Sequence, residues 1–416
     1  MITLKKENLE KIAAEHGLSA GEIQKESALI PGYLKNIETK NQGFYKIIDD
    51  QTIIEKINSF AINAEDKFDH FVVLGIGGSA LGTMALQQSL THLFAQPRLH
   101  VLDNIDPEII KEIQDTIDLK KTLFIIVTKS GTTPETISQY MYFRNLCQNL
   151  DLKTSDRFLF ITDPNHGLLR KIATEEGIIT FEVPPNVGGR FSVLTAVGLL
   201  PARLLNLNIE NLITGAKNMR KSFLSENQTE NLPFLLASIQ YLLYKKGKTI
   251  NVMTPYAQKL IRFADWYGQL LAESIGKDSI GITPISALGA TDQHSQSQLW
   301  NDGPNDKLHI FLKVENPSAD MSIPNIHPKE ESINYLNNVS FNQLFQTEME
   351  GTMQALSKNN RPNIEISIDK LNEETLGELF MLFEGATAFL GEFFGVDAFN
   401  QPGVELSKQI TKQLLS

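Results

Sequence analysis

The chain has 416 residues, of which 42% are hydrophobic and 21% charged, a composition typical of a folded globular protein that excludes a disordered one. Its formal net charge of −11 argues against a nucleic-acid or anionic membrane partner, and no stretch approaches the roughly 18 apolar residues of a membrane-spanning helix. Cys147 is the only cysteine and the N-terminus has no signal-peptide core, so we expect a cytoplasmic protein without disulfides.

The chain begins with an arm, residues 1–60, in which charged and apolar positions alternate as in amphipathic helices. A first domain follows over residues 61–205, where five short apolar runs are separated by helical patterns. This alternation predicts a doubly wound, mainly parallel sheet. The expected strands are Phe71–Leu74, Leu99–Leu102, Leu123–Val127, Phe158–Ile161 and Ile178–Phe181.

A second domain of the same type is predicted over residues 206–395, with strands at Thr249–Met253, Leu308–Leu312 and Ile364–Ile368. Residues 396–416 are expected to hold a C-terminal helix. A chain of this length exceeds a single hydrophobic core, which agrees with two domains. The predicted fold class is therefore α/β, with two doubly wound domains, an N-terminal helical arm and a C-terminal helix.

A glycine-rich turn, Gly75–Gly82, follows the first expected strand and opens a helix. Glycines leave backbone N–H groups free at the helix N-terminus, which suits an anion. The spacing also overlaps the dinucleotide-binding fingerprint, because Asp103 ends the next strand, where a ribose-binding acid would lie. From this turn alone, both interpretations stay open.

A second loop, Thr128–Thr136, follows the third expected strand and again starts a helix. It holds five hydroxyls and Lys129 within nine residues. One hydroxyl would suffice to cap the helix, so this dense set of donors favours a phosphate monoester. Ligands of open α/β sheets bind at the carboxyl ends of strands, where both loops lie. The pair of loops resembles the sugar isomerase (SIS) domain.

Two glycines precede Arg190 in the stretch Asn186–Ser192. They let the backbone approach a ligand closely, and an arginine can stabilise a delocalised oxyanion. A structural salt bridge is the alternative role for Arg190.

The stretch Asp265–Lys277 reads as the end of an amphipathic helix that starts near Pro255 and closes with a left-handed cap at Gly276. Gln269 and Glu273 are four residues apart and therefore share a face of that helix. Glu273 is a candidate general base; taken alone, it could equally be a solvated charge at a helix end.

Four blocks, in this order along the chain, resemble the glucose-6-phosphate isomerase family in its shorter bacterial type. They are Val187–Ser192, Ala272–Lys277, Asp292–His294 and Gln401–Lys408. The resemblance runs from about residue 68 to the C-terminus. It implies two SIS domains, an aldose–ketose isomerase acting on glucose 6-phosphate and fructose 6-phosphate, no metal or organic cofactor, and a homodimer.

The resemblance also implies roles for individual residues. Glu273 matches the proton-transfer base, His294 a ring-opening histidine supplied by the neighbouring subunit, Lys408 a lysine that assists at the ring oxygen, and Arg190 the arginine beside the enediolate. The residues that match substrate-binding positions are Gly78, Ser79, Thr128, Lys129, Ser130, Thr132, Thr133, Gln269 and Gln401. Two positions depart from the family pattern, Pro402 and Ser407, and they bear on where Lys408 lies.

This set of groups suits the chemistry of an aldose–ketose isomerase. A carboxylate can move a proton between C1 and C2 through an enediol, an acid–base group can open the ring, and a cation can hold the enediolate. We further hypothesise that Glu135 orients His294. The other histidines show no metal-ligand spacing, so no metal is expected.

Two other function classes stay open at this point. A non-catalytic SIS-domain regulator would need Ser79 and the Thr128–Thr136 loop, but would not need Glu273, His294, Arg190 and Lys408 together. A dinucleotide oxidoreductase would rest on the glycine-rich turn, and it gives the hydroxyl-rich loop no role.

Overall fold

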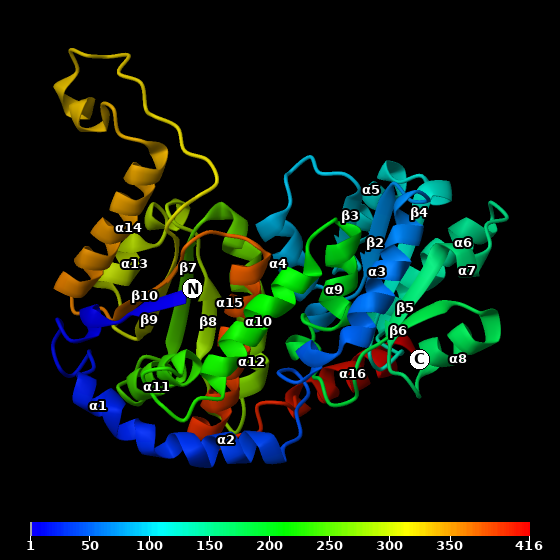
Figure 1. The fold of residues 1–416 in the computed structure, drawn as a ribbon, viewed down its shortest axis with the longest axis horizontal. Helices are drawn as coiled ribbons and strands as arrows, with labels where there is room; N and C mark the ends of the chain where they lie inside the picture. Colours follow the sequence, from blue (N-terminus) through cyan, green and yellow to red (C-terminus); the bar gives the residue numbers. More distant parts are fainter. Residues whose placement is uncertain (1) are drawn as a thin grey trace.

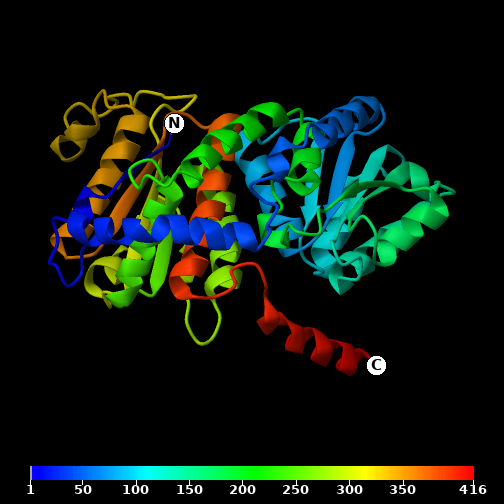
Figure 2. The same cartoon turned by 60° about the horizontal axis from the view of Figure 1, so that its bottom comes forward.

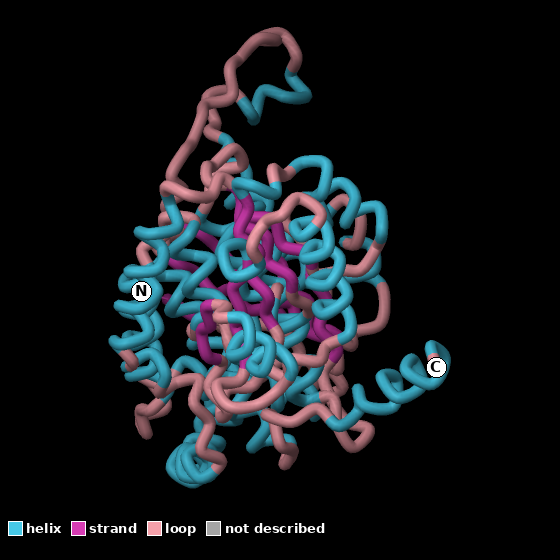
Figure 3. The backbone as a smooth tube through the Cα atoms, turned by 90° about the vertical axis from the view of Figure 1, so that its right-hand side faces the viewer, coloured by secondary structure: helices cyan, strands magenta, loops and turns pink. Residues whose placement is uncertain are grey.

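The computed structural model describes residues 2–416 and contains two five-stranded sheets with helices on both faces of each (Figure 1). The strands lie in the interior of the molecule and the helices surround them (Figure 3). The predicted α/β class with two doubly wound, mainly parallel sheets is confirmed.

The first sheet is parallel throughout and its strand order is β3-β2-β4-β5-β6. Its strands are β2 His70–Leu74, β3 Arg98–Leu102, β4 Thr122–Val127, β5 Phe158–Thr162 and β6 Ile179–Glu182. The surrounding helices are α3 Gln51–Glu65, α4 Leu81–Leu90, α5 Pro107–Thr116, α6 Pro134–Gln148, α7 Thr154–Arg157, α8 Leu168–Glu176 and α9 Ala196–Leu204. Helices α5, α6 and α8 pack on one face, and α3, α4 and α9 on the other. Both faces are therefore covered, which explains why every residue of β4 is buried.

The second sheet has the order β1-β10-β9-β7-β8, with only β1 antiparallel. Its strands are β1 Ile2–Lys5, β7 Ile250–Tyr256, β8 Thr283–Ser286, β9 Lys307–Val314 and β10 Asn363–Ile368. The remaining helices are α1 Ala20–Lys25, α2 Ile30–Thr39, α10 Ile209–Phe223, α11 Leu232–Lys245, α12 Ile261–Ile275, α13 Ser297–Asp302, α14 Phe341–Lys358, α15 Glu373–Phe394 and α16 Glu405–Leu415.

One hydrophobic core joins the inner faces of both sheets through α10, α11, α12 and α15. Helices α13 and α14 cover the outer face of the second sheet with a smaller core around Trp300 and Met353. The two sheets are thus held by a shared apolar interior, and the cleft described below lies between them.

Three local expectations need correction. The arm contains the expected helices α1 and α2, but it opens with a strand, β1, which pairs with β10. The helix of the Asp265–Lys277 stretch does not start near Pro255, because β7 continues through Tyr256 and α12 begins at Ile261. Gly276 has a φ of −72° and is not a left-handed cap.

Candidate active site

A cleft of about 660 Å³ lies between the carboxyl edge of the first sheet and the C-terminal end of α12. Most of the predicted site residues line it. They are Gly78, Ser79, Thr128, Lys129, Ser130, Thr133, Arg190, Gln269, Glu273, Gln401 and Lys408. Residues that are far apart in the sequence therefore meet in one cleft. It lies at a carboxyl edge, where ligands of α/β sheets bind.

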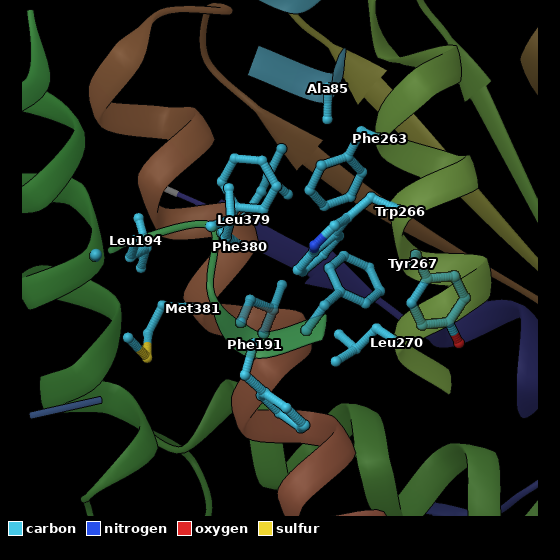
Figure 4. Packing of buried hydrophobic residues seen from close by; sticks show 14 of the residues in the cluster. Ala85, Phe191, Leu194, Phe263, Trp266, Tyr267, Leu270, Leu379, Phe380 and Met381 are labelled. Atoms are coloured by element: carbon cyan, nitrogen blue, oxygen red, sulfur yellow. The ribbon is translucent and has the colours of Figure 1, made fainter. Parts of the chain in front are cut away.

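Helix α12 presents Gln269 and Glu273 to this cleft, while its apolar face is buried in the core. Its apolar side chains Phe263, Trp266 and Leu270 pack against α15 and the segment that follows Arg190 (Figure 4). Trp266 is 2% exposed, so it belongs to the core and does not share the polar face of Gln269 and Glu273. A rigid helix fixes the position of a catalytic group more tightly than a loop does.

The carboxylate of Glu273 is held by two donors and remains partly open to the cleft. Gln269 Nε2 donates to its Oε1 at 3.0 Å, and Arg190 Nη1 donates to its Oε2 at 3.2 Å. The Glu273 side chain is 33% exposed. Lys277 Nζ donates to the carbonyl oxygens of Glu273 and Ser274 at 2.8 and 2.6 Å, so this lysine, rather than Gly276, closes the helix. Burial, together with the charge of Arg190, lowers the pKa of Lys277 to about 8.

Arg190 is almost fully buried behind Glu273, with 3% of its surface exposed. Its Nε donates to Ser274 Oγ at 2.7 Å. Its other donors bind the segment that leads to α16, through Gln401 Oε1 at 2.9 Å, Ala398 O at 2.6 Å and Asn400 O at 3.0 Å. Burial lowers the pKa of Arg190 from its ordinary value, but a guanidinium remains charged at neutral pH. Arg190 thus forms the salt bridge that was its alternative role, and it also lines the cleft.

The hydroxyl-rich loop surrounds the opposite side of the cleft. Thr128 Oγ1 lies 2.7 Å from Thr133 Oγ1 and 3.3 Å from Ser130 Oγ, which gathers three hydroxyls at the N-terminus of α6. Thr133 is the N-cap residue of α6, yet its side chain makes no capping hydrogen bond. Its hydroxyl therefore bonds within this cluster of hydroxyls, which lines the cleft, and not to the helix. Thr132 is exposed and does not line the cleft.

Lys129 lines the cleft, but its amine is already bonded to the backbone. It donates to the carbonyl oxygens of Pro185 and Val187 at 2.7 and 3.0 Å. Burial lowers the pKa of Lys129. Lys129 therefore ties the hydroxyl-rich loop to the segment that carries Gly188 and Arg190.

The glycine-rich turn packs closely against the backbone of the segment that carries Arg190. A Cβ atom on Gly78 would lie 2.3 Å from the carbonyl oxygen of Gly189, and Gly77 has a φ of +57°. Asp103, the acid expected beside a ribose, does not line the cleft. The glycines serve the contact between two loops, which leaves the dinucleotide interpretation without support.

Lys408 reaches the cleft from α16, which extends away from the body of the molecule (Figure 2). Its side chain is 58% exposed and its Nζ donates to Glu405 Oε1 at 2.7 Å. Pro402 begins the short turn before α16, and Ser407 Oγ donates to Val404 O at 3.0 Å, so neither departure blocks the path of Lys408.

His294 does not lie in the cleft of its own chain. It follows β8, whose end pairs with Met253 of β7, so it lies at the carboxyl edge of the second sheet. Glu273 lies near the end of α12, which runs back from that edge to the start of β8. A helix of 15 residues spans about 22 Å, so Glu273 lies close to one helix length from that edge. Glu135 is in the first turn of α6, and no contact with His294 is found within residues 2–416.

A third loop lines the cleft and was missed from the sequence. Asp163, His166 and Gly167 follow β5, at the same sheet edge as the two predicted loops. Asp163 Oδ1 accepts hydrogen bonds from the N–H groups of Asn165 and His166 at 2.8 and 2.9 Å, and these bonds lower its pKa. Its position directly after β5, the fourth strand of the first sheet along the chain, could have identified this loop from the sequence.

Within residues 2–416, no helix is both long and apolar enough to cross a membrane, and no cluster of three or more histidine, cysteine or acidic side chains could hold a metal ion.

Comparison with known proteins finds a matching family and similar sequences that cover most of this chain. The family described as Phosphoglucose isomerase matches residues 43–313 and 340–416. The sequence is 40% identical over 411 residues to a probable glucose-6-phosphate isomerase of Methanococcus maripaludis, covering 96% of this chain and 91% of that protein. It is 43% identical over 380 residues to a glucose-6-phosphate isomerase of Carboxydothermus hydrogenoformans, covering 87% and 82%.

Solved structures share the whole fold. A hypothetical protein from Thermus thermophilus aligns with a TM-score of 0.91 and 31% identity over 100% of both chains. A glucose-6-phosphate isomerase from Chlamydia trachomatis aligns with a TM-score of 0.84 at 22% identity, covering 98% of this chain and 90% of that one, a likeness of fold alone.

Proposed function

This chain belongs to the phosphoglucose isomerase family and interconverts glucose 6-phosphate and fructose 6-phosphate, and we propose that Glu273 is the base of that reaction. The observation that carries the proposal is the juxtaposition of Glu273 with Arg190 on one side of the cleft, facing the hydroxyl-rich loop on the other. A sugar phosphate can span these two sides, with its phosphate away from the reacting carbons.

In the proposed mechanism, Glu273 removes the proton from C2 of the open-chain aldose and returns it to C1 of the resulting enediol. The electron pair left by the proton forms the C1–C2 double bond, and the C1 carbonyl oxygen takes the negative charge. The hydroxyl proton of O2 passes to O1, so that C2 becomes the carbonyl carbon of the ketose when C1 accepts its proton. Arg190 stabilises this charge through the guanidinium edge next to the carboxylate. A well-placed acid–base group contributes roughly 10²–10⁴-fold to the rate.

The phosphate is assigned to the first domain. Ser79, Thr128, Ser130 and Thr133 offer hydroxyl donors there, and the backbone of Gly78 adds an N–H group. Lys129 supports this site by holding the adjacent loop. Gln269 and Gln401 are proposed to contact the sugar; both line the cleft, and each hydrogen-bonds one of the two charged groups. Binding energy from the phosphate positions C1 and C2 against Glu273.

Ring opening is assigned to His294 together with Lys408. Because His294 lies at the far edge of its own second sheet, we propose that it acts in the cleft of a second copy in a homodimer. Exposure of α16 supports this proposal. Its apolar side chains Leu406 and Leu414 are 66% and 82% exposed, as expected for a helix that packs on another chain. The role of Glu135 in orienting His294 would then also join two chains.

Hydrogen exchange in D₂O tests the assignment of Glu273. Wild-type protein is expected to exchange a C1 hydrogen of fructose 6-phosphate with solvent, followed by NMR, and Glu273→Gln is expected to lose both exchange and isomerisation. Glu55→Gln, an exposed change on α3, is the matched control and keeps both. Substantial exchange by Glu273→Gln would show that another group is the base.

A further inference from the structure

A second cavity lies at the opposite edge of the first sheet, where the parallel strands begin. Its volume is about 880 Å³, compared with about 660 Å³ for the cleft, and no residue lines both. It is bounded by the C-terminal end of α3 and by the residues that lead into β4 and β5. The strands run between the two, so this cavity is separate from the isomerase site.

The lining of this cavity is cationic although the chain as a whole carries a net charge of −11. Asp66 and Asp156 are its only acidic residues within the part of the chain that the structure describes. Its cationic residues are Lys67, Lys120, Lys121 and Arg157. Four positive and two negative charges leave a balance of +2. A local excess of this kind attracts an anionic ligand.

Arg157 is the one cation in this set with a buried, unpaired donor. Its guanidinium carbon lies 5.5 Å from the centroid of the Phe68 ring, a cation–π contact. Its Nε is buried without a hydrogen-bond partner among residues 2–416. The Nε faces the interior, so a ligand in the cavity would meet the Nη groups, whose planar fork suits phosphate oxygens.

The three lysines are equally available to a ligand. Lys67, Lys120 and Lys121 are exposed at the cavity, and no ion pair joins them to an acid in residues 2–416. Lys120 and Lys121 directly precede β4, while Arg157 directly precedes the adjacent β5. The cations that precede these two neighbouring strands therefore line the same cavity.

The wall beside these cations is apolar. Phe60, Phe68, Leu123 and Leu159 line it, and Phe60, which is half-buried, is the most exposed of them, because the other three are at most 7% exposed. A bare phosphate ion would use the cations and leave this wall uncovered. A phosphorylated ligand with a flat, weakly polar ring would cover both parts, and cavities of roughly 300–1,000 Å³ suit ligands of that size.

We propose that this cavity binds a nucleotide, with its phosphates on Arg157 and the lysines and its base against the Phe60 and Leu123 wall. The site is independent of the proposed roles of Glu273 and His294, since it shares no residue with the cleft.

Isothermal titration calorimetry with ADP, in the presence of a chelator, tests the proposal on the full chain. Wild-type protein is expected to bind ADP, and Arg157→Gln is expected to weaken binding roughly tenfold or more, since a charge-assisted bidentate contact is lost. The double variant Lys120→Gln/Lys121→Gln changes exposed, unpaired side chains and should weaken binding similarly while keeping the fold intact.

Two controls locate the site. Lys153→Gln removes an exposed cation that is near Arg157 in sequence but does not line the cavity, and it should leave ADP affinity unchanged. The cleft variant Ser130→Ala/Thr133→Val should also bind ADP normally. Absence of ADP binding by the wild type, or its loss in the cleft variant alone, would overturn the proposal. Inorganic phosphate binding as tightly as ADP would overturn the assignment to a nucleotide.

Discussion

Arg190 Nη1 and Glu273 Oε2 lie 3.2 Å apart, and the two side chains differ sharply in exposure, at 2% and 33%. The guanidinium is fixed in the interior by Ser274 and two backbone carbonyls, while the carboxylate faces the cleft. A buried cation that is held by the fold can stabilise charge on a substrate without rearranging, which is the basis of electrostatic preorganisation. Arg190 therefore links the stability of the fold to the proposed catalysis.

Replacing Arg190 should damage both properties. Arg190→Ala removes one of the two donors to Glu273 and takes the guanidinium from the Ala398 and Asn400 carbonyl oxygens, and loss of one member of a buried ion pair typically costs about 3–5 kcal/mol in the free energy of unfolding. Arg190→Lys keeps the charge but cannot make the same set of bonds, so we expect an intermediate loss of stability and a large loss of kcat. Urea unfolding and steady-state kinetics measure the two effects. Arg262→Lys, on the exposed side of α12, is the control, and an Arg190→Lys variant with normal kcat would contradict this role.

Removing hydroxyls from the proposed phosphate site should act mainly on binding. We expect Ser130→Ala/Thr133→Val to raise KM for fructose 6-phosphate about tenfold with little change in kcat, since ground-state and transition-state contacts to the phosphate are lost equally. The Thr133 side chain caps no helix N–H, so the double change should leave α6 intact. Thr116→Val, which removes an exposed hydroxyl on α5, controls for the substitution. An unchanged KM would place the phosphate elsewhere.

Glu384 gives a pH-dependent prediction about stability. It is 0% exposed on α15, both carboxylate oxygens lack a partner among residues 2–416, and burial raises its pKa well above the ordinary value. A raised pKa means that the folded state favours the protonated form. Its contribution to stability is therefore full below the unfolded pKa of about 4.3 and is lost as pH rises through the folded pKa.

Glu384→Gln removes this titration. The free energy of unfolding of the variant, relative to wild type, should rise between pH 5 and pH 8 by up to about 1.4 kcal/mol per pH unit, the limit for one proton. Urea unfolding at several pH values measures the difference. Glu55→Gln, on the exposed face of α3, should show no such trend, and a flat difference for Glu384→Gln would argue that Glu384 is ionised in the folded protein.

Much of the fold was predictable because its signals are local. The inner strands β2, β4 and β5 of the first sheet are almost wholly buried, so their sequences are continuous apolar runs, and the Thr128–Thr136 loop that follows β4 carries a dense polar signal. The elements that were missed lack such a signal. Strand β1 depends on pairing with β10 at the other end of the chain, and β8 contains Pro284 and only partly exposed or exposed side chains.

The sequence indicated which residues line the cleft better than it indicated their contacts. Resemblance to a family brought together Glu273, Arg190 and Lys408, and family membership now resolves the regulator and oxidoreductase alternatives in favour of the isomerase. Sequence patterns could not show that the Lys129 amine is bound to Pro185 and Val187 carbonyl oxygens. Such contacts depend on how distant loops pack.

Subunit complementation tests most directly whether the isomerase site joins Glu273 of one copy to His294 of another. Glu273→Gln and His294→Ala proteins, each nearly inactive alone, are mixed in equal amounts under conditions that allow subunit exchange, and fructose 6-phosphate conversion is followed by a coupled assay. Random exchange in a two-fold dimer gives half heterodimers with one intact site each, so we expect about a quarter of wild-type activity. No recovered activity, despite exchange demonstrated by native mass spectrometry, would contradict a shared site.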